Sequence, residues 1–258
     1  MLTEERLQTI QNMVERRKSA SIQELVDELD ISESTVRRDL TLLHQQGRIS
    51  KVRGGAMACG SHYSTEDDSV TSRRDRNLKE KQSIACYAAS LIQPHDFIYL
   101  DAGTTTELII DYLEERDVVF VTNALAHARK LSLLGYTTYI LGGEFKATTE
   151  AVVGDEAVQS LHKYNFTKGF WGTNGVSLKG GFATPDVKEA MIKKTAMDNC
   201  SECFVLCDSS KFSQISCVKF SEIANAVIIT TELTKEILGD EYNDYESVGS
   251  FRIVKDQL

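Results

Sequence analysis

The sequence has few prolines and lacks any long apolar run, and both absences restrict the class of protein. Only 2 of its 258 residues are proline while 41% are hydrophobic, a composition typical of a compact, ordered chain. No apolar stretch reaches the 18 residues expected of a membrane-spanning helix. The opening residues, Met-Leu-Thr-Glu-Glu-Arg, contain no apolar signal-peptide core, so secretion is not expected. These absences predict a globular, cytoplasmic protein.

A second Cys-x2-Cys pair is also missing, although the chain has six cysteines. The four late cysteines that could suggest a zinc site are Cys200, Cys203, Cys207 and Cys217. No histidine follows them at ligand spacing, and Cys203 and Cys207 flank a stretch typical of a buried strand. Because unpaired cysteine is often buried, we expect reduced structural cysteines, no metal and no cofactor.

The negative charge is concentrated in the second part of the chain. Residues 1–57 carry nine basic and nine acidic side chains, whereas residues 58–258 hold all of the net charge of −9. Within the first part, residues 31–57 carry five basic groups against two acidic ones. A local basic footprint matters more for phosphate contact than the total charge does, so the first segment alone is suited to nucleic acid.

Three helices are predicted before residue 47. Apolar residues at helical spacing indicate helices over 4–18 and 33–46, and Ser21 with Glu24 forms a capping box that opens a short helix between them. In the third helix, apolar residues from Val36 onward form an inward face. The residues on its other faces suit base edges and phosphates in a DNA major groove: Ser34, Thr35, Arg37 and Arg38. The alternative is an ordinary helix with a solvated polar face.

A basic hairpin is predicted directly after the third helix. Gly47 is placed to end that helix, and residues 48–56 alternate apolar with basic or polar residues before two glycines turn the chain. The basic residues of this wing are Arg48, Lys51 and Arg53. Three helices and a wing predict a winged helix-turn-helix DNA-binding domain over residues 1–57.

The remainder of the chain predicts a linker and an α/β domain. Residues 58–75 are small and polar, as in a linker, and residues 76–258 form the second domain. Its first helix is predicted over 77–92, after which apolar strands alternate with helical segments, indicating a mostly parallel sheet. The predicted strands are residues 97–100, 118–121, 138–141, 169–172, 203–207 and 226–229. Ligands of such sheets bind beyond the carboxyl ends of the strands.

The turn after the first of these strands is the strongest candidate for an anion site. It begins at Asp101, and Gly103 allows a close backbone approach. The amides of Thr104, Thr105 and Thr106 are placed at a helix N-terminus, which fits a phosphate. The chain has neither the Gly-x4-Gly-Lys-Ser/Thr loop of nucleoside triphosphate sites nor the dinucleotide fingerprint after this strand. The alternative is a threonine-capped helix that binds nothing.

Polar turns at the other strand exits accompany this motif. They offer amides, hydroxyls, side-chain amides and one ammonium, which could converge on a polyhydroxylated, phosphorylated ligand. The residues singled out in them are Asn123, Gly142, Gly143, Asn174, Gly175 and Lys211.

The order of these segments resembles the DeoR family of bacterial transcriptional regulators. Its N-terminal signature is similar to residues 36–40, 47–49 and 53–56, with Arg53 where family members often have histidine. The strand-exit turns resemble the family's sensor domain, which is similar in fold to ribose-phosphate isomerase, glucosamine-phosphate deaminase and CoA-transferases. The resemblance covers about residues 4–57 and 74–231.

This resemblance implies a homo-oligomeric repressor of a sugar-utilisation operon that binds double-stranded operator DNA and a sugar phosphate. The residues from Gly103 to Thr106 would hold the phosphate and Lys211 would add charge. The residues that would contact sugar hydroxyls are Asp101, Asn123 and Asn174. Such an effector alters operator affinity only if it prefers one state of the protein.

Two other functions are compatible with parts of this pattern. A sugar-phosphate isomerase or deaminase would need an acid/base, for which the candidates are Asp101, Glu144, Glu150 and Asp208. The N-terminal module could also bind protein. An isomerase has no need of Arg37 and Arg38 beside a basic wing, so we expect a regulator and no enzyme activity.

Overall fold

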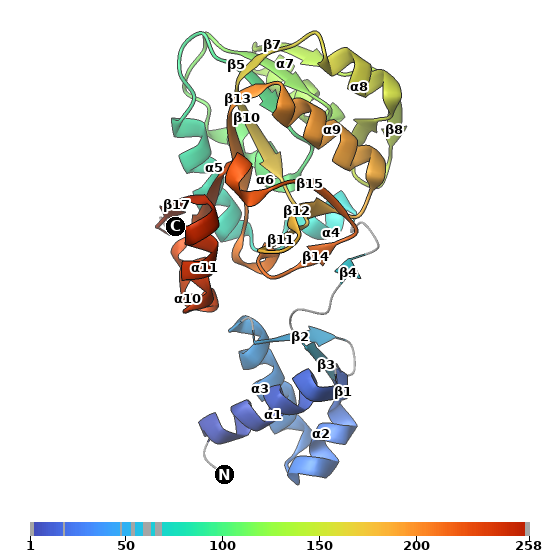
Figure 1. Cartoon of the computed structure of the whole chain (residues 1–258), viewed down its shortest axis with the longest axis vertical. Helices are drawn as coiled ribbons and strands as arrows, with labels where there is room; N and C mark the ends of the chain where they lie inside the picture. The colour runs from blue at the N-terminus through green and yellow to red at the C-terminus, as the bar shows by residue number, and fades with distance from the viewer. Residues whose placement is uncertain are drawn as a thin grey trace. The chain divides into compact units, whose positions relative to one another are not determined.

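The computed structural model describes residues 3–17, 19–46, 48–52, 55–58, 63–64 and 69–255. It divides into two units, Met1–Tyr63 and Ser64–Leu258, which are described one at a time (Figure 1). No helix among the described residues is long and apolar enough to cross a membrane.

The first unit contains the three predicted helices and a small antiparallel sheet. Its elements are α1 (Thr3–Arg17), β1 (Ser19–Ser21), α2 (Ile22–Leu29), α3 (Glu33–Gln45), β2 (Ile49–Val52) and β3 (Gly55–Ala58). The capping box is confirmed, because Ser21 accepts from the Glu24 amide while the Glu24 carboxylate accepts from the Ser21 amide. Val36 and Leu40 of α3 are fully buried with residues of α1 and α2, so this unit has its own core.

The sheet of the first unit has three strands, one more than the sequence predicted. β1 pairs with β3, and Ser21 lies opposite Gly55. A Cβ atom at Gly55 would lie 2.2 Å from the carbonyl oxygen of Ala20, so only glycine allows this approach. The sequence predicted the wing hairpin, but β1 has three residues, too few to show a strand period.

A seven-stranded parallel sheet organises the second unit and confirms the predicted fold class. Its strands are β5 (Phe97–Leu100), β6 (Val119–Thr122), β7 (Thr137–Ile140), β10 (Phe166–Gly172), β13 (Cys200–Leu206), β16 (Val227–Thr231) and β17 (Ser250–Val254). The spatial order is β17-β16-β13-β10-β5-β6-β7. From β5 the chain adds β6 and then β7 on one side. It then crosses back to β10 and adds β13, β16 and β17 on the other side. The boundary between β5 and β10 is where such sheets bind ligands.

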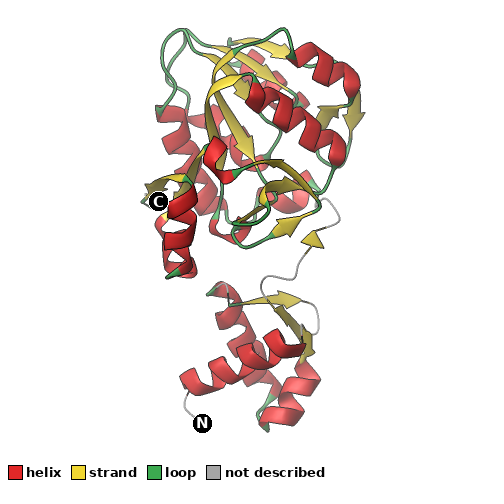
Figure 2. Ribbon diagram, viewed as in Figure 1, coloured by secondary structure: helices red, strands yellow, loops and turns green. Residues whose placement is uncertain are grey.

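Helices cover both faces of this sheet (Figure 2). Side chains alternate along β5, with Ile98 and Leu100 in one apolar cluster and Tyr99 in the other. The helical elements that contribute residues to the cluster of Ile98 are α5 (Leu78–Ser90), α6 (Thr104–Ile109), η1 (Ile110–Tyr112) and α7 (Leu125–Leu133). Those that contribute residues to the cluster of Tyr99 include α8 (Asp155–Leu161), α9 (Val187–Asp198), α10 (Glu232–Leu238) and α11 (Glu241–Val248).

Several short elements were not predicted. The longer of them form the pair β8 (Glu144–Lys146) and β9 (Ala151–Val153), and the three-stranded sheet β11 (Gly175–Ser177), β12 (Gly181–Thr184) and β15 (Val218–Ser221). Others are α4 (Val70–Arg74), β4 (Tyr63–Ser64), η2 (Ser209–Lys211), β14 (Ile215–Ser216), η3 (Ile223–Asn225) and the strand β17 of the large sheet. α4 lies within the range predicted as linker, so part of that range is helical.

Trp171 is in the core of the second unit. Its side chain is fully buried on β10, between the ring of Tyr99 and the backbone of Gly169. A Cβ at Gly169 would lie 2.2 Å from the indole, so the glycine makes room for the ring. Cys207 is buried and Cys203 packs against the same cluster, in keeping with structural roles.

Candidate functional site

The N-terminal end of α3 presents the residues predicted to read DNA. Ser32 is the N-cap and accepts from the Thr35 amide at 3.3 Å. Its hydroxyl also lies 3.0 Å from that of Ser34 and 2.8 Å from that of Thr35. Ser34 is exposed and Thr35 is partly exposed, so both hydroxyls are accessible.

The two arginines of α3 differ in their surroundings. Both are exposed, but the Arg37 guanidinium donates to Glu33 one turn earlier, at 2.6 Å, whereas no described residue pairs with Arg38. The neighbouring Asp39 is buried and accepts two hydrogen bonds from Arg6 of α1. This ion pair neutralises the one acidic residue in the Val-Arg-Arg-Asp-Leu segment, so the exposed surface of α3 remains basic.

The basic residues of the wing are only partly described. The Arg48 guanidinium donates to Gln11 at 2.6 Å and Gln8 at 2.7 Å, and therefore lies against α1. Lys51 is exposed and donates to the Thr41 hydroxyl of α3. Arg53 and Gly54, predicted in the wing, and Gly47, predicted to end α3, lie outside the described residues.

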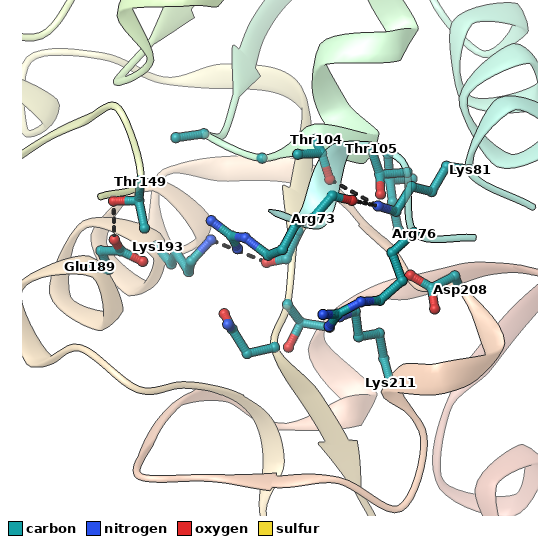
Figure 3. Close-up of a pocket in the computed structure, with 16 residues that line it drawn as sticks. Arg73, Arg76, Lys81, Thr104, Thr105, Thr149, Glu189, Lys193, Asp208 and Lys211 are labelled. Carbon is teal, nitrogen blue, oxygen red and sulfur yellow. Dashed lines mark hydrogen bonds between the residues drawn. The ribbon is translucent and has the colours of Figure 1, made fainter. Parts of the chain in front are cut away.

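A polar pocket lies at the carboxyl ends of β5, β10 and β13, at the boundary between β5 and β10 (Figure 3). Residues from α4, α5, α6, α9 and η2 also line it. The residues that line it are Arg73, Arg76, Lys81, Ala102, Gly103, Thr104, Thr105, Thr149, Gly172, Thr173, Asn174, Glu189, Lys193, Leu206, Asp208 and Lys211. Five of these side chains are cationic, which suits an anionic ligand.

Lys81 joins two edges of this pocket. Its ammonium donates to the Thr104 hydroxyl at 3.1 Å and to the backbone carbonyl of Arg73. Burial lowers the pKa of Lys81 to about 8, and the nearby charges of Lys211, Arg73 and Arg76 act in the same direction, against Asp208. A bound anion would favour the charged form of this lysine.

Asp208 and Glu80 fix the turn that carries Lys211. Burial acts to raise the pKa of Asp208, but the charge of Lys211 and hydrogen bonds from Ser210 and Asn77 hold it below its ordinary value. Glu80 of α5 accepts from the Ser209 amide and hydroxyl, both at 2.9 Å, and burial raises its pKa. These contacts connect α5 to η2 beneath the pocket.

Lys193, which lines the pocket, forms a buried ion pair with Asp101 behind it. The Lys193 ammonium donates to the Asp101 carboxylate and, at 3.1 Å, to the carbonyl of Gly172. The Gly172 amide donates to Asp101 in return. Burial raises the pKa of Asp101 and the Lys193 charge opposes the rise. The pair therefore ties the exit of β5 to the exit of β10.

The structure brings five of the predicted effector residues onto the pocket and leaves six off it. Those that line it are Gly103, Thr104, Thr105, Asn174 and Lys211. Those that do not are Asp101, Thr106, Asn123, Gly142, Gly143 and Gly175.

Several of the residues off the pocket have roles in the fold. Thr106 is fully buried and donates to the Asp101 carbonyl at 2.7 Å, and Asn123 accepts from the Ala102 amide at 2.9 Å. Gly143 and Gly175 each allow a close backbone approach, because a Cβ there would lie 2.7 Å from Val153 and 2.5 Å from Gln214. Gly103 has an extended backbone with φ 177°, so no special dihedral angle requires glycine there.

Six polar residues of the pocket were missed in the sequence: Arg73, Arg76, Lys81, Thr149, Glu189 and Lys193. The run from Arg73 to Arg76 was the one usable signal, since three of its four residues are basic. Lys81 and Lys193 lie within helices, where a charged residue resembles an ordinary solvated position.

Comparisons with known proteins agree over both units. A family model described as DeoR-like helix-turn-helix domain matches residues 6–62, and one described as DeoR C terminal sensor domain matches residues 76–232. The chain is 41% identical over 245 residues to the HTH-type transcriptional regulator FruR of Bacillus subtilis (strain 168), covering 95% of this chain and 96% of that protein. It is 33% identical over 232 residues to the lactose phosphotransferase system repressor of Staphylococcus epidermidis, covering 88% and 91%.

Among solved structures, ribose 5-phosphate isomerase A from Methanocaldococcus jannaschii aligns with a TM-score of 0.40 and 19% identity, covering 53% of this chain and 55% of that one. The family matches and the full-length relatives instead identify a DNA-binding regulator, not an enzyme. The chain belongs to the DeoR family of transcriptional regulators.

Proposed function

We propose that this chain is a repressor of a sugar-utilisation operon and that a phosphorylated sugar bound in the pocket controls its affinity for operator DNA. The observation that carries the proposal is the convergence of five cationic side chains and the Thr104 and Thr105 hydroxyls at the topological boundary of the sheet. The names of relatives support it, since one of them is a repressor of a lactose phosphotransferase system.

The charges around the pocket favour one phosphate group. Lys193 is compensated by Asp101, and Asp208 compensates one of the two nearby lysines, Lys81 and Lys211. With Glu189 included, the five cationic side chains of the pocket exceed the carboxylates of Asp101, Asp208 and Glu189 by two charges. A phosphate monoester carries about −1.5 to −2 at neutral pH, which matches this surplus.

The other side of the pocket suits hydroxyl groups. The Thr149 hydroxyl donates to Glu189 at 2.6 Å, and Asn174 accepts from the Thr184 hydroxyl at 3.2 Å. Carboxylate, amide and hydroxyl groups there can exchange hydrogen bonds with a sugar. We infer a ligand with a phosphate near Lys81 and hydroxyls near Glu189.

The effector half of the proposal is tested by thermal shift. Hexose 1- and 6-phosphates, pentose 5-phosphates and inorganic phosphate are added to the full chain, because a ligand that binds only the native state raises its melting temperature. Thr105→Val removes one hydroxyl that lines the pocket and should weaken the response about ten- to hundredfold in concentration. Thr9→Val, at a partly exposed threonine of α1 in the other unit, is the control. Absence of any stabilisation of the wild type by the whole panel would refute the effector.

The DNA half is tested with Arg38→Ala and Arg37→Ala. DNA that binds the wild type is selected from a random pool, and affinity is measured across a range of salt concentrations. Loss of one phosphate contact should lower the slope of log affinity against log salt by about one unit, and loss of a base contact should cost about 1–3 kcal/mol at one base pair. The matched control is Arg129→Ala, since Arg129 belongs to the second unit. Wild-type affinity in both α3 variants would contradict the assignment.

We also infer that the regulator acts as a homo-oligomer. Helix-turn-helix proteins commonly bind two half-sites as dimers, so the selected DNA should contain a repeated or inverted half-site. Analytical ultracentrifugation of the full chain measures the state directly, and a monomer at the concentrations that bind DNA would contradict this inference.

A further inference from the structure

The short helix α4 connects the chain of the first unit with the pocket of the second. The first unit ends at Tyr63, and α4 begins at Val70. It is the first described helix after the DNA-binding unit, yet two of the five cations of the pocket, Arg73 and Arg76, lie in or directly after it.

Both ends of α4 are held by residues around the pocket. The Val70 amide donates to the Thr148 carbonyl at 3.2 Å, next to the lining residue Thr149. At the other end, the carbonyl of Arg73 accepts from Lys81, which also contacts Thr104. One end of α4 is therefore held by Lys81, a cation that lines the pocket, and the other end by the residue next to Thr149.

The Arg73 side chain gives an independent indication that the pocket binds an anion. It extends into the pocket (Figure 3), and its Nε atom is buried without a hydrogen-bond partner among the described residues. A buried guanidinium N–H with no acceptor costs free energy, and a phosphate oxygen would supply the missing acceptor.

We propose that α4 transmits occupancy of the pocket to the DNA-binding unit, with Arg73 as the residue that couples the two. This inference rests on the proposed function. A phosphate that accepts from Arg73 fixes the helix to which the DNA-binding unit is joined by the chain. Because a ligand shifts an equilibrium only by its differential affinity for the two states, Arg73 contributes that difference when its contact forms in one arrangement of α4 alone. Lys211, on η2, binds the same phosphate without touching α4.

The experiment compares Arg73→Ala with Lys211→Ala. The probe is the sugar phosphate from the panel that raises the wild-type melting temperature most, and affinity for the selected DNA is measured without it and at saturation. Both variants should need about ten- to hundredfold more of the probe, since each loses a hydrogen bond to a charged group. At saturation, the ratio of the two DNA affinities should stay at the wild-type value in Lys211→Ala and fall to near one in Arg73→Ala.

Arg74→Ala is the control on the same helix. Arg74 is exposed, does not line the pocket, and pairs with Glu107 at 3.1 Å in a surface ion pair of small energetic value. In Arg74→Ala, the ratio of the DNA affinities without and with the probe should match that of the wild type. A wild-type ratio in saturated Arg73→Ala would overturn the coupling role while leaving the effector intact, whereas a wild type that no sugar phosphate stabilises would overturn the proposed function itself.

Hydrogen exchange covers the case in which Arg73→Ala cannot be saturated. In the wild type, the probe should slow amide exchange in residues 70–76 by about tenfold or more, because bonded amides exchange only when the helix opens. Residues of α8, which contribute nothing to the pocket, serve as the internal reference. Unchanged protection of α4 in the saturated wild type would overturn the proposal.

Discussion

The pKa of Lys81 makes the positive charge of the pocket depend on pH. Its ammonium is buried among other cations, and burial lowers its pKa to about 8. The charged form is therefore costly in the empty pocket. A phosphate would reverse this cost, because the anion stabilises the same charge that burial disfavours.

The first prediction concerns the pH dependence of effector affinity. Binding should require charged Lys81, so affinity is full below pH 8 and is lost as the pH rises above it. At the acidic end, affinity should fall below about pH 6, where the phosphate becomes a monoanion. Titration calorimetry at pH 8 in buffers of different ionisation enthalpy should show uptake of about half a proton per site.

Lys81→Arg supplies the control for this prediction. The guanidinium stays charged at all these values of pH, so the variant should lose the alkaline decline and the proton uptake while keeping the acidic decline. An alkaline decline that persists in Lys81→Arg would assign the titration to another group.

At the scale of elements, the contact between α5 and η2 holds Lys211 in place. Glu80 of α5 accepts three hydrogen bonds, from the Ser209 amide and hydroxyl and from the Thr231 hydroxyl at 2.8 Å. It does not line the pocket. Its effect on a ligand would therefore pass through the position of η2.

The second prediction is that Glu80→Ala lowers stability and effector affinity together. Removing the carboxylate leaves buried donors unpaired, which costs about 1–3 kcal/mol for each group left unsatisfied. Urea unfolding measures the stability and thermal shift measures the affinity. Glu80→Gln keeps one acceptor oxygen and the shape of the side chain. Its losses of stability and of effector affinity should therefore be smaller. Wild-type effector affinity in a destabilised Glu80→Ala would show that η2 needs no such anchor.

How far the sequence predicts each element depends on whether its signal is local. The strand at Phe97–Leu100 was predicted with its observed bounds, because a short apolar run before a polar turn is visible in the sequence. α4 was missed because it has five residues and depends on a contact from Val70 to Thr148, far along the chain. Such an element has no period to detect.

The pocket lies at the strand exits, where the sequence predicted a site, but only some of the predicted residues line it. Strand exits mark the edge where a ligand binds, so the turn at Thr104 and Thr105 could be found. Thr106 and Asn123 have the same chemistry, but their hydrogen bonds go to the backbone, which the sequence does not reveal. Lys193 of α9 pairs with Asp101, which is 92 positions earlier in the chain, so only the fold brings the two together.

At the scale of the whole molecule, the two units have separate apolar cores. One core contains Leu25 and Leu40 of the first unit, and the clusters on either face of the large sheet contain residues of the second unit alone. Each unit should therefore have its own unfolding transition, and a ligand should shift the transition of the unit that binds it.

The third prediction follows for calorimetry of the full chain. A sugar phosphate at 100 times its dissociation constant stabilises the unit that binds it by about 2.7 kcal/mol, which should raise that transition by roughly 5–10 °C. Selected DNA should raise the transition of the first unit instead. A sugar phosphate that moves both transitions equally would show that the units unfold as one.

The packing of Trp171 against Gly169 has an optical consequence. It is the one tryptophan of the chain, and its indole is enclosed by the core of the second unit. Light absorbed by this ring is emitted at short wavelength while the apolar surroundings persist, and at longer wavelength once water reaches it. The first unit has no such fluorophore and unfolds without this signal. The emission of native protein is therefore a built-in reporter of one unit, and no dye or added tryptophan is needed to follow it.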